Sequence, residues 1–210
     1  MLAKYFCAKV WVLISYSVES VNNGGFAVYN SELGKERNMD VFDCIKTRRS
    51  IRNYTSQPID KTDIDKIIES AVWTPSGKNG QPWKFKVITD KGLSEQISEI
   101  SIYGKWMTNA PCFICVFLNK QQSYDHIKDV QSCGAVIQNI MLCAHSLGIG
   151  SCWIGEILEK SDQVIKLLKL DENRYELMAL VTLGYKASRT LNPGRRDINS
   201  FLLEDGGDIE

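Results

Sequence analysis

The chain has 210 residues, a length that fits one domain or one domain with an appended segment. Its hydrophobic fraction of 44% is ordinary for a globular protein, and 25 basic and 25 acidic residues give a formal net charge of zero. A neutral chain has no broad electrostatic attraction for nucleic acid or an anionic membrane surface, so we expect neither as a partner.

The seven cysteines are scattered and mostly lie in apolar runs. An odd, scattered set favours a reducing cytoplasm over a disulfide framework. Cys112 and Cys115 form a C-x-x-C, but the apolar run 112–118 predicts a buried strand, in which positions three apart point to opposite faces. We therefore expect two separately buried thiols and no metal site.

Residues 1–38 differ in character from the rest of the chain. They hold an apolar stretch, 10–18, that is too short to span a bilayer, and no small-residue cleavage site clearly follows it. A more regular pattern begins at Met39. We predict that 1–38 is an appendage to a folded domain of residues 39–210, with a membrane anchor as the alternative.

From Met39 onward, helical and strand periods alternate along the chain, which indicates a mixed α and β fold. The first predicted helix has an apolar face of Val41, Phe42 and Ile45 and ends near Arg48. The later predicted elements are a helix capped near residue 60 or 62 and ending before 75, a strand at 85–89, a helix at 93–101, a strand at 112–118, a helix at 129–147, a helix at 162–170 and a strand at 178–183.

The helix predicted for residues 129–147 is apolar nearly all round, so it should be buried on several sides, one of them a subunit interface. Gly148 should close it as a C′ glycine. His145 in this helix is interpreted as a satisfied core residue rather than a metal ligand. Ser161 is expected to cap the next helix.

The first segment that suggests chemistry is R-R-S-I-R-N-Y at residues 48–54. Three guanidiniums within five residues repel one another unless an anion or carboxylates neutralise them, and the planar donor set of arginine suits phosphate. If the segment is extended, Arg48, Ser50 and Arg52 point to one side. The alternative is a solvated basic turn, favoured by the helix C-terminus that precedes it.

Two further segments are rich in small and polar residues. Residues 74–83, T-P-S-G-K-N-G-Q-P-W, form a loop between a helix and a strand, and their amide side chains match the edge of a heterocycle. Residues 148–155, G-I-G-S-C-W-I-G, follow the long helix, and their glycines let backbone N–H groups approach a flat ligand. A structural turn is the alternative interpretation of each segment.

Taken together, in this order and spacing, the three segments resemble the nitroreductase family. Its hallmarks are R-R-S-I-R-x-Y, then P-S-x-x-N-x-Q-P-W, then C-W-I-G after a long central helix, and the resemblance covers about residues 39–203. It implies an α+β fold, with a central mixed or antiparallel sheet flanked by helices. It also implies a homodimer with the long buried helix at its interface and two FMN sites that each draw on both chains.

The resemblance also implies particular cofactor ligands. Arg48 and Ser50 match the family's FMN-phosphate ligands, with Arg49 beside them, and a late basic ligand is matched by Arg195 or Arg196. The segment that the partner subunit contributes is matched by Pro75, Ser76, Gly77 and Asn79, with Gln81 nearby.

Arg52 resembles the residue that reaches the N1 and O2 side of the flavin. Trp153, Ile154 and Gly155 resemble the loop whose backbone N–H groups face the flavin N5 and O4. The stretch 103–105, Y-G-K, departs from better-known nitroreductases, in which an amide and a lysine help to hold the flavin.

The activity implied by the resemblance is FMN-dependent oxidoreduction. NADH or NADPH would pass hydride to FMN N5, and a small electron-poor acceptor such as a nitroaromatic or a quinone would then take the electrons at the same place, in a ping-pong sequence. No acid–base side chain is expected to be indispensable. The alternatives are another task on the same fold, such as azoline oxidation, halogen removal or flavin fragmentation, and a non-catalytic FMN-binding protein.

Overall fold

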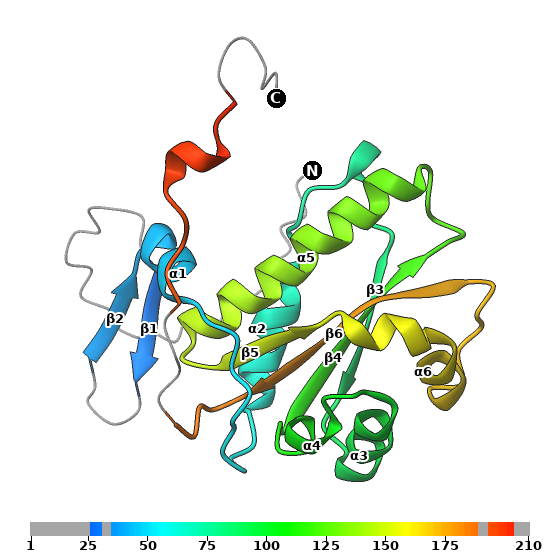
Figure 1. Ribbon diagram of the computed structural model, residues 1–210, viewed down its shortest axis with the longest axis horizontal. Coiled ribbons are helices and arrows are strands. Elements are labelled where there is room, and N and C mark those ends of the chain that lie inside the picture. Colours follow the sequence, from blue (N-terminus) through cyan, green and yellow to red (C-terminus); the bar gives the residue numbers. More distant parts are fainter. Residues whose placement is uncertain (1–25, 31–34, 189–192, 204–210) are drawn as a thin grey trace, which may run out of the picture.

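The computed structural model describes residues 26–30, 35–188 and 193–203 (Figure 1). Its strands are β1 (Phe26–Asn30), β2 (Lys35–Met39), β3 (Trp83–Ile88), β4 (Cys112–Asn119), β5 (Gly150–Ile154) and β6 (Tyr175–Gly184). Its α-helices are α1 (Val41–Thr47), α2 (Lys61–Val72), α3 (Lys91–Ile100), α4 (Gly104–Met107), α5 (His126–Ser146) and α6 (Ser161–Leu167). Short 3₁₀ turns cover Gly77–Asn79, Glu156–Lys160 and Ile198–Phe201.

The main sheet has four strands in the order β3-β4-β6-β5, and every neighbouring pair is antiparallel. Strand β4 lies inside the sheet and is buried along its whole length, as its apolar sequence predicts. Cys112 packs on one face of the sheet and Cys115 on the other. The predicted separation of the two thiols is therefore confirmed, because a strand places positions three apart on opposite faces.

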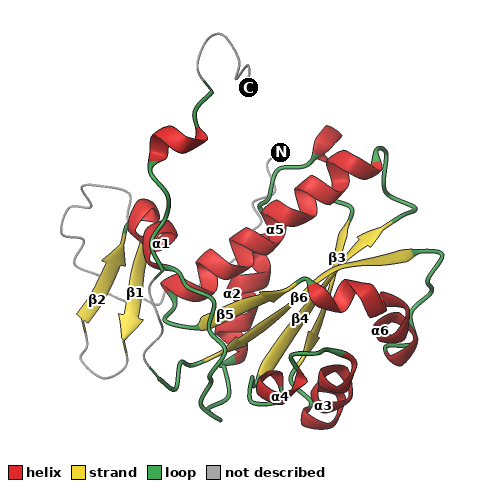
Figure 2. Cartoon of the chain, viewed as in Figure 1, coloured by secondary structure: helices red, strands yellow, loops and turns green. Residues whose placement is uncertain are grey.

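Helices cover both faces of this sheet, which gives three layers (Figure 2). Helices α2 and α5 pack on one face, and α3, α4 and α6 pack on the other. Each face has its own core of buried apolar side chains, centred on alternate residues of β4. The α+β class with an antiparallel sheet is confirmed.

The long helix α5 sits diagonally across one face of the sheet (Figure 1). It begins at His126, three residues before the predicted start, because the Asp125 carboxylate accepts a hydrogen bond from the backbone N–H of Lys128 at 3.1 Å. It ends as predicted: Gly148 has φ +77°, and Ile149 N donates to Ala144 O at 2.8 Å.

Helix α1 ends where predicted, although its apolar face is uncovered, and the predicted cap of α6 was wrong. The apolar face of α1 is not packed in the chain, since Val41, Phe42 and Ile45 are 57%, 66% and 49% exposed and Cys44 is the buried residue of that helix. Ser161 is the first residue of α6 and not its cap, because the 3₁₀ turn that ends at Lys160 leads directly into the helix.

The N-terminal region is described only in part, and the apolar stretch 10–18 lies outside the described residues. Strands β1 and β2 form an antiparallel hairpin that pairs Phe26 with Met39 and makes no part of the main sheet. Within ranges 26–30, 35–188 and 193–203, no helix is both long enough and apolar enough to cross a membrane.

Candidate functional site

The basic segment 48–54 leaves α1 in an extended conformation and runs beside β5. Ile51 N donates to Ser151 O at 2.9 Å, and Ser50 forms a parallel bridge with Ser151. Gly150 permits this approach, because a Cβ atom at that position would lie 2.7 Å from Cγ1 of Ile51. The fold therefore brings the first and third segments of the sequence together.

The side chains of this extended segment differ in burial, with Arg48 and Ser50 half-buried and Arg52 exposed. Ile51 is buried at 7% exposure. Arg52, Ser50 and Arg48 lie near the thiol of Cys152, which belongs to the same buried core as Ile51. Burial raises the pKa of this thiol, whereas Arg52, a hydrogen bond with Ser50 and then Arg48 lower it. The three predicted ligands therefore lie in the neighbourhood of Cys152.

Arg49 turns away from this side. Its Nη1 donates to the carbonyl oxygens of Lys46 at 2.6 Å and Arg48 at 2.7 Å, at the end of α1. A cation in this position satisfies helix carbonyls and interacts favourably with the helix dipole. These hydrogen bonds of Arg49 thus go to the end of α1, whereas Arg48 is half-buried and Arg52 is exposed.

Arg48 is the half-buried cation of the cluster. Its pKa is lowered by burial first, then by the nearby charges of Arg195 and Arg49. Its Nη1 is buried, and among the described residues it has no hydrogen-bond partner. A buried guanidinium nitrogen without an acceptor is unfavourable, and a phosphate oxygen would satisfy it. The donor set therefore fits an anion such as a phosphate ester.

The two late arginines differ in position. Arg195 lies near enough to Arg48 to lower its pKa, and its Nη1 donates to Gly194 O at 3.2 Å. Arg196 instead stacks on the ring of Phe201, with 4.7 Å between the guanidinium carbon and the ring centroid. Of the two alternatives, the structure places Arg195 beside the candidate anion site.

The loop after α2 is held by its own side chains. Ser76 Oγ accepts from Gln81 N at 3.0 Å, and Gln81 Nε2 donates to Asn79 O at 3.3 Å. Thr74 is tied to α5, because Asn139 Nδ2 donates to its Oγ1 at 2.8 Å. Pro75, by contrast, is exposed. Hydrogen bonds among its own side chains and to α5 thus hold the loop in place near the surface.

Within one chain, this loop and the basic segment lie near opposite ends of α5. Gly77 rests against Tyr124, just before the helix begins. The basic segment follows α1, which contacts the far end of α5 through a hydrogen bond between Thr47 and His145 at 2.9 Å. A helix of 21 residues is about 30 Å long. Within one chain, the Gly77 end of the loop is therefore separated from the basic segment by most of the length of α5.

The third segment forms β5, which is an edge strand of the sheet. Ser151 O faces the outer edge, where it accepts from Ile51. Because backbone groups alternate between the two edges of a strand, those of Trp153 face the same outer edge. The Trp153 side chain is 42% exposed, Ile154 is buried, and Gly155 is exposed. This edge offers backbone donors to a flat ligand.

His145, interpreted from the sequence as a core residue, lies beside the basic cluster. Thr47 Oγ1 donates to Asp43 O at 2.6 Å, so the imidazole Nε2 must donate in its 2.9 Å contact with Thr47. Burial, then Arg48, Lys186 and Arg49, lower the pKa of His145. Sequence reasoning missed this neighbourhood because α1 and the end of α5 are far apart along the chain.

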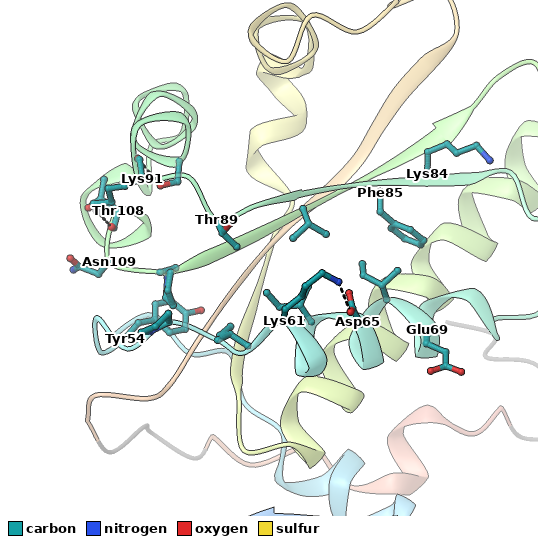
Figure 3. Close-up of a pocket in the computed structure, with 18 of the residues that line it drawn as sticks. Tyr54, Lys61, Asp65, Glu69, Lys84, Phe85, Thr89, Lys91, Thr108 and Asn109 are labelled. Carbon is teal, nitrogen blue, oxygen red and sulfur yellow. Dashed lines mark hydrogen bonds and ion pairs between the residues drawn. The ribbon is translucent and has the colours of Figure 1, made fainter. Parts of the chain in front are cut away.

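A large groove of about 1550 Å³ lies elsewhere, between α2 and β3 (Figure 3). Phe85 of β3 lines one side of the groove. Lys61 and Asp65 of α2 line the other side and form an ion pair of 2.6 Å. Among the predicted cofactor ligands, Gln81 alone lines this groove. This groove is therefore distinct from the basic segment, where the buried unpaired donor of Arg48 lies.

The chain is similar to known proteins over most of its length. The model of the Nitroreductase family matches residues 45–103 and 101–185. A protein of Methanothermobacter thermautotrophicus with the provisional name NADH dehydrogenase/NAD(P)H nitroreductase is 37% identical over 169 residues, which are 79% of this chain and 85% of that protein. The FMN reductase (NAD(P)H) of Bacillus subtilis is 30% identical over 174 residues, 74% of this chain and 70% of that protein.

Solved structures show the same similarity. The crystal structure of a provisionally named nitroreductase from Desulfovibrio desulfuricans, in complex with FMN, has a TM-score of 0.76 and 34% sequence identity. The match covers 82% of this chain and all of that chain.

Proposed function

The chain belongs to the nitroreductase family, and from this premise we propose that it is an FMN-dependent oxidoreductase, which uses NADH or NADPH to reduce a small electron-poor acceptor such as a nitroaromatic or a quinone. The observation that carries the proposal is the buried, unpaired Nη1 of Arg48. It stands beside Ser50 and Arg195, where a phosphate group would complete its hydrogen bonding.

Each site residue receives a role in this proposal. Arg48 and Ser50 hold the FMN phosphate together with Arg195. Arg52, which is exposed beside Cys152, brings a positive charge to the N1 and O2 side of the ring. Backbone donors of Trp153 and Gly155 face the opposite edge of the ring. FMN, when bound, supplies the hydride and electron transfer, and the protein supplies orientation and electrostatic stabilisation.

We propose that two copies of the chain are needed for one site. The loop with Ser76 and Asn79 lies far from Arg48 in one chain, so a second copy must bring it there. Exposed apolar side chains support an association: Phe42 on α1 is 66% exposed, and Leu203 near the described C-terminal end is 93% exposed. Apolar groups of this size are commonly covered in an oligomer.

We also propose that residues 39–210 form the flavin-binding domain, with 1–38 as an appendage, and that the protein acts in the cytoplasm. All six cysteines among the described residues are free, in agreement with a reducing compartment. Sulfhydryl titration of protein isolated with the cytoplasmic fraction checks this assignment, and a disulfide in the freshly isolated chain would contradict it.

The main experiment is purification followed by flavin analysis. The protein should be yellow, release FMN on denaturation, and lose its flavin absorbance when NADH or NADPH is added without oxygen. A non-catalytic FMN carrier would stay yellow after NADH is added and also after NADPH is added. A colourless protein that gains no thermal stability from FMN would contradict the proposal, because a ligand that binds only the folded state must stabilise it. An aerobic and anaerobic series of nitroaromatic and quinone acceptors then defines the substrate.

A further inference from the structure

The turn at residues 77–79 has an unfavourable backbone conformation. Lys78 and Asn79 have φ of 53° and 54°, and Gln81 follows with φ of 46°. Only asparagine among these adopts the left-handed region with some ease. Backbone conformations of this kind persist where the surrounding structure holds them in place.

The ring of Tyr124 lies directly against this turn. A Cβ atom built on Gly77 would collide with the phenol oxygen and with ring carbons of Tyr124. The ammonium nitrogen of Lys78 lies 4.8 Å from the centroid of the same ring, and that of Lys128 lies 5.5 Å from it. The turn therefore closes over an aromatic ring that leaves no space for a larger residue at its first position.

The backbone of Tyr124 is hydrogen-bonded just before α5 begins, and its side chain is 40% exposed. The carboxylate of Asp129 is 1% exposed, and its Oδ2 accepts from Tyr124 N at 3.1 Å and from Ser123 Oγ at 2.7 Å. A buried carboxylate with several donors fixes the backbone on which the ring is mounted. The contact between the ring and the turn is thus anchored in the core.

We propose that Tyr124 is a positioning residue of the flavin site, whose ring holds the Gly77–Asn79 turn so that Ser76 and Asn79 face the flavin of the partner subunit. The inference rests on the proposed function. It adds a residue that lies outside the segments 48–54, 74–83 and 148–155 and that acts through the loop instead of touching the flavin.

The first test compares Tyr124→Ala with Tyr124→Phe in the holoenzyme. Loss of the ring should speed FMN dissociation about tenfold, which corresponds to roughly 1.4 kcal/mol. The phenylalanine variant keeps the ring face that contacts Lys78, so it should stay near the wild-type rate. Thermal unfolding of the flavin-free proteins serves as the control, because a merely structural role would lower the midpoint without a specific effect on FMN dissociation.

The second test adds a methyl group at the contact. Gly77 does not have a left-handed φ, so Gly77→Ala should act through collision with Tyr124 and not through backbone strain. It should speed FMN dissociation in the wild-type background and have little further effect in Tyr124→Ala. Tyr124→Phe removes only the phenol oxygen and leaves the colliding ring carbons, so most of the loss caused by Gly77→Ala should persist in that background.

These results separate the inference from the proposed function. If wild-type protein binds no FMN, the proposed function fails. If wild-type protein binds FMN but Tyr124→Ala keeps its dissociation rate, or Gly77→Ala and Tyr124→Ala are additive, Tyr124 does not position the loop. If Tyr124→Ala does not fold, Gly77→Ala decides the question, because an unchanged FMN dissociation rate in that variant would overturn the inference.

Discussion

Arg48 has the local environment of an anion ligand, and Arg49 has that of a helix cap, although the two are adjacent in the chain. One guanidinium is half-buried with an unpaired nitrogen, and the other donates to carbonyl groups at the end of α1. The difference arises because an extended backbone sends neighbouring side chains to opposite sides.

Arg48→Ala should weaken FMN binding by about 10- to 150-fold, because a hydrogen bond to a charged group contributes about 1.5–3 kcal/mol. Titration of the flavin-free protein with FMN measures this change. Arg49→Ala removes the same charge from the adjacent position and should have a clearly smaller effect on FMN affinity. Equal losses in the two variants would mean that general positive charge, and not the unpaired donor of Arg48, holds the phosphate.

The environment of His145 leads us to expect that the free energy of unfolding depends on pH. Burial, Arg48, Lys186 and Arg49 lower its pKa from the ordinary 6.5. A histidine whose folded-state pKa is lowered stabilises the fold above its unfolded-state pKa, and this contribution is lost as the pH falls through the folded-state value. On going from about pH 7.5 to about pH 5.5, wild-type protein should lose more unfolding free energy than His145→Gln, which keeps a donor for Thr47.

Urea unfolding of both proteins without flavin, at the two pH values, makes the comparison. All other titratable groups are common to both proteins, so their contributions cancel in the difference. Equal losses in the two proteins would show that His145 has no effective pKa shift. Bound FMN should reduce the difference, because its phosphate charge offsets the arginines around the imidazole.

The packing of the basic segment against β5 depends on Gly150, which has no side chain. A Cβ atom at Gly150 would lie 2.7 Å from Ile51 Cγ1 and 2.9 Å from its Cβ. Overpacking of this kind costs about 1–3 kcal/mol. Gly150→Ala should therefore destabilise the protein by that amount and also weaken FMN binding, because the segment that carries Arg48 and Ser50 must move away from the strand.

Thermal and urea unfolding, together with FMN titration, measure both effects. Gly92→Ala is the matched control, since its added Cβ would meet only Asp90 Oδ1 at an ordinary 3.5 Å in the first turn of α3. It should be neutral or slightly stabilising. A Gly150→Ala protein with normal stability and normal FMN affinity would show that the edge of β5 tolerates the shift.

The proposed dimer makes a prediction about mixed subunits. Arg48 and Asn79 lie at opposite ends of α5, so one site should combine Arg48 of one chain with Asn79 of the other. In a heterodimer of Arg48→Ala and Asn79→Ala chains, one site carries both substitutions and the other carries neither. Random assortment makes half of the dimers heterodimers, so about a quarter of wild-type activity should return on co-expression.

Activity of a verified heterodimer carrying two distinguishable tags makes the measurement. The homodimeric variants, which should be nearly inactive, provide the baseline. A heterodimer without activity would place both residues in the site of one chain, and sedimentation of an active, flavin-loaded monomer would refute the two-chain site altogether.

Truncation tests the proposed division of the chain. Every candidate ligand follows Met39, and the β1–β2 hairpin makes no part of the main sheet. Deletion of residues 1–38 should therefore leave FMN affinity and NAD(P)H oxidation unchanged. A soluble truncated protein that binds no flavin would instead assign this region to the site.

Local chemistry was enough to predict much of the fold. Burial and capping leave short-range patterns in a sequence, so a few residues suffice to predict an element. Examples are the apolar run of β4, the helical period of α2 and α5, and the glycine that follows α5. The opposite directions of Cys112 and Cys115 followed from strand alternation alone. The order of the three segments was also sufficient to indicate the family.

Only the tertiary structure decided how these segments meet. It separated Arg48 from Arg49, brought Arg195 to the first of them, and left the apolar face of α1 uncovered. It also seated Tyr124 on Gly77, 47 positions earlier in the chain. No local period encodes such contacts, because they depend on where the packing of helices on the sheet places distant parts of the backbone.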